Sequence, residues 1–288
     1  MDGQEQLSDL KPEKGFFIGI DSDGCAFDTM EIKHKECFCP NFIRYYRLQQ
    51  VSKYAREAWE FVNLYSTGRG NNRFLAVSES LRLLSLRKEV NARDFDVPSA
   101  EPLLKWTNIE SKLSNHSLKK YAAEANDPFI DQTLEWSLKV NEDIEKMVTG
   151  ISPFPFVVEC LEKTNSRADV MVVSQTPYDA LRREWIENKI DQYVRMIAGQ
   201  EQGTKTEHLR FAAKGKYPDD KILMIGDALG DLKAATSNGV LFYPINPGKE
   251  EESWKRLSEE GLKRFFSGNY KGEFQEKLIR EFKLFKFK

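Results

Sequence analysis

Five short apolar runs, each four or five residues long, recur along the chain. They are Phe16–Ile20, Val170–Val173, Val194–Ile197, Ile222–Ile225 and Val240–Tyr243. Most are bounded by Gly, Ser, Asp, Asn or Pro, and runs of this kind are typical of strands buried on both faces of a parallel sheet. The pattern therefore predicts five buried parallel strands.

Helical patterns separate the last four of these runs. They cover residues 178–189, 204–214 and 229–237. Strands that alternate with helices of this length are typical of right-handed βαβ units. We therefore predict an α/β fold with a doubly wound, Rossmann-like parallel sheet.

The stretch between the first and second runs has a different pattern. In Val51–Val62 apolar residues recur at the three- and four-residue spacing of an amphipathic helix, and the same spacing recurs over 74–84. Asp127 and Pro128 form an N-cap followed by proline, which predicts a helix from there to about Val148. We expect an α/β core of residues 1–29 and 154–288, interrupted by an all-helical domain of residues 30–153.

The last forty residues are predicted to form two helices. In the final one, apolar residues follow a helical spacing and predict a buried face. They are Leu278, Ile279, Phe282 and Phe285.

Composition and charge narrow the classes of function. The 288 residues carry a net charge of −2, which argues against a general nucleic-acid-binding protein. No segment approaches the roughly 18 uninterrupted apolar residues that span a bilayer. The polar start, Met1–Lys14, does not resemble a secretory signal. We therefore expect a cytoplasmic protein that binds neither membrane nor nucleic acid, and the oligomeric state is left open.

Residues that could take part in catalysis or in metal binding cluster where the predicted strands end. Because the carboxyl ends of parallel strands share one edge of the sheet, these residues are expected to converge there. They are Asp21, Asp23 and Gly24 after the first strand, Ser174 and Gln175 after the second, Lys205 after the third, and Asp227 and Asp231 after the fourth.

These segments resemble the four motifs of the haloacid dehalogenase-like superfamily of phosphohydrolases. In order they are FFIGIDSDG with Asp21 and Asp23, VMVVS with Ser174, GTKTEHL with Lys205, and ILMIGDALGD with Asp227 and Asp231. The resemblance covers residues 15–29 and about 155–245. The helical insert matches only by position, at the place where this superfamily often carries a helical cap.

The resemblance implies a role for each catalytic residue. Asp21 would be the nucleophile that attacks phosphorus and forms an aspartyl-phosphate. Asp23 would act as general acid to the leaving oxygen and then as base toward water. Lys205 would neutralise charge on the phosphoryl group.

The resemblance also implies a magnesium ion and a phosphate-binding set. Oxygen ligands for Mg²⁺ would come from Asp21, the backbone carbonyl of Asp23 and Asp227. Asp231 is the fourth residue expected at the metal site, where it would orient Lys205 or a metal-bound water. The residues expected around the phosphate are Ser174, Gln175 and Gly24.

Ordinary structural explanations compete with these roles. An acid after a strand is usually a turn former or a helix N-cap. Lys214 and Lys216 compete with Lys205 for the lysine position. Lys205 lies 22 residues before Asp227, which leaves room for a helix and a strand, whereas Lys214 lies only 13 before it. We therefore prefer Lys205.

The segment Ser66–Phe74 (STGRGNNRF) joins two predicted helices of the insert. Arg69 and Arg73 could bind an anion through bidentate contacts, and Asn72 could bind hydroxyl or amide groups. We predict that these three residues contact the substrate. A polar loop between helices, without a substrate role, is an equally open explanation.

The function predicted from these residues is a magnesium-dependent phosphatase acting on a small phosphorylated metabolite. A phosphomutase of the same superfamily and a catalytically silent binding protein are the alternatives. Dehalogenases of the superfamily lack the second aspartate of the first motif, so Asp23 argues against that reaction. The sequence does not identify the substrate.

Overall fold

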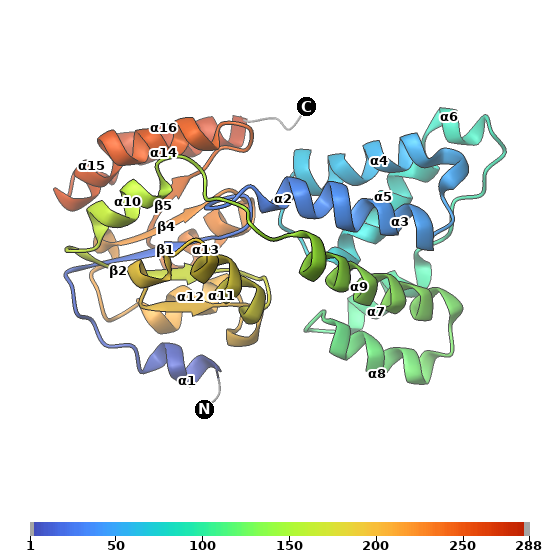
Figure 1. Ribbon diagram of the computed structural model, residues 1–288, viewed down its shortest axis with the longest axis horizontal. Helices are drawn as coiled ribbons and strands as arrows, with labels where there is room; N and C mark the ends of the chain where they lie inside the picture. The colour runs from blue at the N-terminus through green and yellow to red at the C-terminus, as the bar shows by residue number, and fades with distance from the viewer. Residues whose placement is uncertain (1–2, 285–288) are drawn as a thin grey trace. The chain divides into compact units, whose positions relative to one another are not determined.

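The computed structural model describes residues 3–284. The chain forms two compact units, one built from the residues up to Met30 and from Gly150 onward, and the other from Glu31–Thr149 (Figure 1). No helix within the described range is long and apolar enough to cross a membrane. The assignment of the two units as catalytic core and cap stays a prediction.

The first unit contains a five-stranded, all-parallel sheet in the order β3-β2-β1-β4-β5. Its strands are β1 (Phe16–Ile20), β2 (Ala168–Val173), β3 (Met196–Ala198), β4 (Ile222–Gly226) and β5 (Leu241–Pro244). The predicted α/β fold is confirmed. Strand β3 begins two residues later than predicted, because the N–H of Val194 donates to the Asp191 carbonyl in a preceding turn.

Helices cover both faces of this sheet. Those of the first unit are α1 (Gly3–Ser8), α2 (Thr29–Ile32, which crosses into the second unit), α10 (Val157–Thr164), α11 (Tyr178–Glu187), α12 (Lys205–Ala212), α13 (Leu229–Asn238), α14 (Glu250–Arg256), α15 (Leu262–Phe266) and α16 (Glu273–Leu284). A π-helical turn, Leu257–Gly261, joins α14 to α15. The two predicted C-terminal helices are therefore a composite α14–α15 segment and α16.

Alternate residues of each strand enter different cores. Ile18 and Ile20 of β1 join a cluster with Trp185 of α11. Phe17 joins the opposite cluster with Leu209 of α12. This two-residue alternation places α10, α11, α14 and α15 on one face and α1, α12 and α13 on the other.

Helix α16 packs against the edge strand β5. Leu278 and Phe282 are buried and Ile279 packs against the core, as the apolar spacing predicts. The fourth residue of that predicted face, Phe285, lies outside the described residues.

The second unit is helical and contains no strand over residues 31–149. Its helices are α3 (Cys39–Tyr45), α4 (Ser52–Glu60), α5 (Arg73–Ser85), α6 (Lys88–Asn91), α7 (Glu101–Ile109), α8 (Asn115–Ala125) and α9 (Pro128–Met147), with π-helical turns at Lys33–Phe38 and Phe61–Tyr65. Helix α9 begins as predicted, because Asp127 Oδ1 accepts the N–H of Phe129 at 2.8 Å. Trp59, Trp106 and Trp136 are fully buried in this unit.

Candidate active site

The candidate site begins at the carboxyl ends of β1 and β4. Connections on the two sides of this strand pair run over opposite faces of the sheet, which makes it the topological switch point. Ile20 pairs in register with Ile225, and the N–H of Asp21 donates to the Ile225 carbonyl at 3.0 Å. Asp21 therefore lies beside the segment that leads into Asp227.

Three buried aspartates meet at this point. Asp21 is 4% exposed, Asp227 is 1% exposed and Asp231 is completely buried. One carboxylate oxygen from each lies within 4.8 Å of the others. Carboxylate oxygens gathered this closely are suitable ligands for a hard divalent cation.

Lys205 joins two of these aspartates. Its Nζ donates to Asp21 Oδ2 and to Asp231 Oδ1, each at 2.6 Å. The competing lysines lie elsewhere, since Lys214 pairs with Asp219 and Lys216 donates to carbonyls near the end of α1. Of the three lysines, the structure brings Lys205 to the acids.

The position of Lys205 follows from the start of α12. Thr204 caps this helix and accepts the N–H of Glu207 through its hydroxyl, while the Glu207 carboxylate accepts the N–H of Thr204. This capping box fixes the first turn, in which Lys205 is the first helical residue.

Burial and the charges of neighbouring groups together shift the pKa values in this cluster. Burial is the largest cause that raises the pKa of the Asp21 carboxyl; Lys205 opposes it, and the charges of Asp231 and Asp227 add to it. Burial likewise raises the pKa of Asp231. Burial alone would lower the pKa of Lys205, but the carboxylates of Asp21 and Asp231 outweigh it and raise that pKa. One ammonium among three acids leaves a strong attraction for a further cation.

Gly226 allows Asp231 to approach the end of β4. A Cβ at position 226 would lie 2.3 Å from the Cγ of Asp231, so a side chain cannot be accommodated there without movement. Asp231 Oδ2 also accepts the N–H of Ala228 at 2.9 Å, at the start of α13. The sequence prediction did not include Gly226, although a glycine directly before Asp227 was the available signal.

Asp23 is held by two hydroxyl groups. Thr29 donates to its Oδ1, and Thr176 donates to its Oδ2 at 2.6 Å. The sequence prediction did not include either threonine. Thr176 lies two residues after Ser174 in the loop that follows β2, but only the folded structure shows that its side chain meets Asp23.

The predicted phosphate-binding residues already take part in local contacts. Ser174 is 2% exposed, and its Oγ accepts the N–H of Thr176 at 3.2 Å, which leaves its own proton available for donation. The side chain of Gln175 donates to the Gly203 carbonyl at 2.8 Å. Gly24 has a φ of 76° and donates its N–H to the Phe27 carbonyl. Their roles in phosphate binding stay predictions.

The predicted substrate residues of the insert have partners within the helical unit. Asn72 caps α5 through the N–H of Phe74. Arg73 of α5 donates to the side chains of Ser137 and Asn141 on α9, at 3.1 and 2.7 Å.

Asn72 and Arg69 also contact backbone carbonyls of the same unit. Asn72 Nδ2 donates to the Leu113 carbonyl at 3.1 Å, and the buried Arg69 donates to the Leu64 carbonyl at 3.4 Å. Contacts of this kind would also be present if the segment were only a polar loop between helices, without a role in substrate binding. A role for Arg69, Asn72 and Arg73 in substrate binding stays a prediction.

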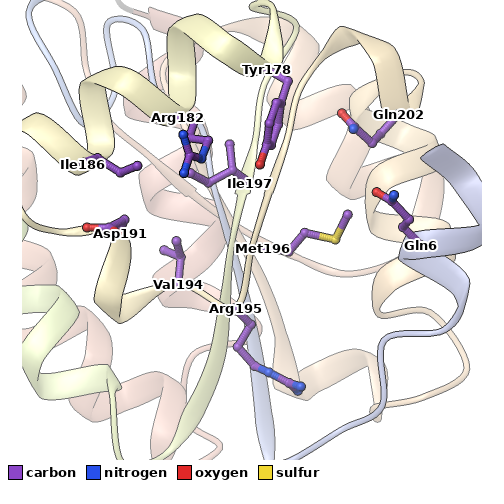
Figure 2. Close-up of a pocket in the computed structure, with 10 residues that line it drawn as sticks. All are labelled: Gln6, Tyr178, Arg182, Ile186, Asp191, Val194, Arg195, Met196, Ile197 and Gln202. Carbon is purple, nitrogen blue, oxygen red and sulfur yellow. The ribbon is translucent and has the colours of Figure 1, made fainter.

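A surface recess of about 540 Å³ lies along the edge strand β3. Figure 2 shows Tyr178 and Arg182 of α11 on one side of the strand, with Gln6 and Gln202 on the other. None of the predicted site residues lines this recess. It therefore does not form part of the acid cluster.

Comparisons with known proteins show likeness at the level of structure. No family model and no curated protein matches the chain. Among solved structures, a haloacid dehalogenase-like family hydrolase from Streptococcus pneumoniae is 12% identical, with a TM-score of 0.45, covering 83% of this chain and 90% of its own.

Two further solved structures are similar to a comparable extent. A protein described as a predicted phosphatase from Clostridium acetobutylicum is 14% identical, with a TM-score of 0.46, covering 87% of this chain and 100% of its own. The L-2-haloacid dehalogenase from Xanthobacter autotrophicus is 13% identical, with a TM-score of 0.39, covering 94% and 88%. These names describe those proteins, and the activity of this chain has to be argued from its own residues.

Proposed function

We propose that the chain is a haloacid dehalogenase-like phosphatase that hydrolyses a small phosphorylated metabolite with the help of Mg²⁺. The observation that carries this proposal is the ion-paired arrangement of Asp21, Lys205 and Asp231, with Asp227 beside it, at the switch point of the sheet. The order of the four sequence motifs supports the same reaction.

Asp21 is the proposed nucleophile. Its Oδ2 is paired with Lys205, and its Oδ1 accepts the N–H of Ser22 at 2.8 Å. Both contacts favour the ionised carboxylate and fix its direction. One carboxylate oxygen attacks phosphorus while the bond from phosphorus to the leaving oxygen breaks, and the phosphoryl group is transferred to Asp21.

Asp23 is proposed to move the protons. It gives its proton to the leaving oxygen in the first step and takes a proton from the attacking water in the second. That water forms a bond to phosphorus as the bond to Asp21 breaks, so free phosphate leaves and Asp23 is protonated again. Ser174 would donate its remaining proton to a phosphoryl oxygen.

The acids present fit a magnesium ion. Asp21 and Asp227 offer buried carboxylate oxygens, and the backbone carbonyl of Asp23 is the third expected ligand. When bound, Mg²⁺ would supply positive charge to the phosphoryl oxygens. The contact between Asp231 and Lys205 supports an orienting role for Asp231, which would position the ammonium toward the transferred group.

The proposal can be tested with a panel of phosphorylated metabolites, assayed for phosphate release with Mg²⁺ and with excess chelator. We expect Mg²⁺-dependent hydrolysis of at least one compound, and its loss in Asp21→Asn and Asp227→Asn. Asp220→Asn, which changes an exposed acid of the same unit, is the matched control and should retain activity. Hydrolysis that survives Asp21→Asn would contradict the mechanism.

A further inference from the structure

Asp23 is fixed from two separate parts of the first unit. The hydroxyl of Thr29, in the first turn of α2, contacts one carboxylate oxygen, and the hydroxyl of Thr176, after β2, contacts the other at 2.6 Å. Thr29 is fully buried. A hydroxyl can donate to a carboxylate and accept from a carboxylic acid, so these contacts can persist in both protonation states of Asp23.

The backbone of Thr176 is itself tightly held. Its N–H donates to Ser174 Oγ at 3.2 Å, and its carbonyl accepts the N–H of Gln200 at 3.1 Å. A Cβ at Gly199 would lie 2.7 Å from the Thr176 carbonyl oxygen. The ends of β2 and β3 together therefore determine where the Thr176 hydroxyl lies.

We propose that Thr176 is a positioning residue for proton transfer by Asp23. This inference rests on the proposed phosphatase function. Through its hydrogen bond to Oδ2, Thr176 keeps the carboxyl group of Asp23 in the orientation that delivers a proton to the leaving oxygen. Thr176 acts through Asp23 and does not itself contact the reacting atoms.

A positioning role predicts a particular dependence on the leaving group. The departing oxygen of an alkyl phosphate needs a proton, whereas 4-nitrophenolate is a good leaving group without one. Loss of proton transfer should therefore affect alkyl phosphates selectively. The parameter to compare is kcat/KM, because it reports the steps up to phosphoryl transfer and is independent of the later hydrolysis of the phosphoenzyme.

The test compares Thr176→Val with Thr176→Ser on 4-nitrophenyl phosphate and on the alkyl phosphate that the parent protein hydrolyses fastest. We expect Thr176→Val to lose about 10- to 100-fold in kcat/KM on the alkyl phosphate and less than about 3-fold on 4-nitrophenyl phosphate. The loss stays at or below the lower end of the roughly 10²- to 10⁴-fold effect of general acid catalysis, because Asp23 itself is retained. Thr176→Ser keeps the hydroxyl and should remain within about 3-fold of the parent on both.

Thr236→Val is the matched control, because the Thr236 hydroxyl donates to the Leu232 carbonyl within α13, away from Asp23. Gly199→Ala is a second route to the same effect, because its Cβ displaces the Thr176 carbonyl and so shifts the hydroxyl away from Asp23 without removing it. If Thr176→Val does not fold, Gly199→Ala should still show the selective loss.

Equal losses on the two esters, or no loss on either, would overturn the positioning role while leaving the proposed function intact. A parent protein that hydrolyses neither ester in an Asp21-dependent manner would overturn the proposed function, and this inference with it.

Discussion

Gly226 has no side chain, and the position of Asp231 depends on this. The carboxyl carbon of Asp231 lies where a Cβ of residue 226 would point, only 2.3 Å away. Any larger residue must push Asp231 away from β4 and so disturb its contact with Lys205. The close approach therefore connects a backbone position of the strand to the ion pairs of the site.

Gly226→Ala is expected to lower kcat/KM for phosphate release by about 100-fold, the size of loss that an error of about 1 Å in positioning can cause. Gly230→Ala is the matched control, because a Cβ at Gly230 meets nothing within 4 Å. The measurement is kcat/KM for phosphate release, determined by steady-state kinetics for both variants. An active Gly226→Ala variant would show that the site does not require this approach of Asp231.

His208 lies one turn after Lys205 on α12 and is fully buried. Burial, reinforced by the charge of Lys205, lowers the pKa of its imidazole from 6.5 to about 4. The unfolded chain therefore binds more protons than the folded chain between these pH values. The contribution of His208 to stability is complete above about pH 6.5 and decreases as the pH falls toward 4.

The free energy of unfolding, measured by urea denaturation between pH 5 and 7, should fall with decreasing pH by a larger amount in the parent protein than in His208→Phe, which lacks this ionisable group. Identical pH dependence in the two proteins would show that the His208 imidazole is not protonated preferentially in the unfolded chain.

Individual site residues could be predicted from their place at the strand ends. Asp21, Lys205 and Asp231 follow β1, β3 and β4, and the structure brings them together. Thr29 and Thr176 could not be predicted in this way, because their role depends on side-chain directions that strand order does not determine.

Among the secondary-structure elements, the edge strand β5 is protected by polar side chains from the C-terminal region. The N–H of Phe242 donates to Gln275 Oε1 at 3.0 Å, and the Phe242 carbonyl accepts the hydroxyl of Tyr270 at 2.8 Å. Unpaired backbone groups at an edge otherwise invite pairing with another chain. These two contacts also attach the region around α16 to the sheet.

Tyr270→Phe removes the hydroxyl donor from a buried carbonyl and should lower the free energy of unfolding by about 1–3 kcal/mol. Tyr193→Phe is the control, because the Tyr193 hydroxyl makes an exposed contact of 3.3 Å with Glu162. Chemical denaturation of both variants provides the comparison. Equal effects would contradict a specific role for the Tyr270 hydroxyl at the sheet edge.

The strands of the α/β core could be predicted because each one buries a run of apolar residues. Strand β1 has the predicted bounds, whereas β3 is displaced because Val194 belongs to a turn. In the helical unit, α5 and α9 were predicted from their spacing and caps. The short α6 was not predicted, because one helical turn is too short to show a periodic pattern.

In the whole molecule, the chain leaves the α/β unit after Met30 and returns to it at Gly150. Over the same stretch the sequence changes from strand-like runs to helical spacing. Asp21 and Asp23 precede the interruption, and Lys205, Asp227 and Asp231 follow it. Folding of the α/β unit is therefore what assembles the acids into one site.

In the proposed reaction, the phosphoryl group is transferred to Asp21 before water releases it. To detect this intermediate, the protein is mixed with 4-nitrophenyl phosphate and Mg²⁺, the reaction is quenched in acid during turnover, and the modified peptide is mapped by tandem mass spectrometry. We expect a phosphoryl group on Asp21 in the parent protein and none in Asp21→Asn. Turnover without modification of Asp21, or with the phosphoryl group on another residue, would contradict the proposed reaction.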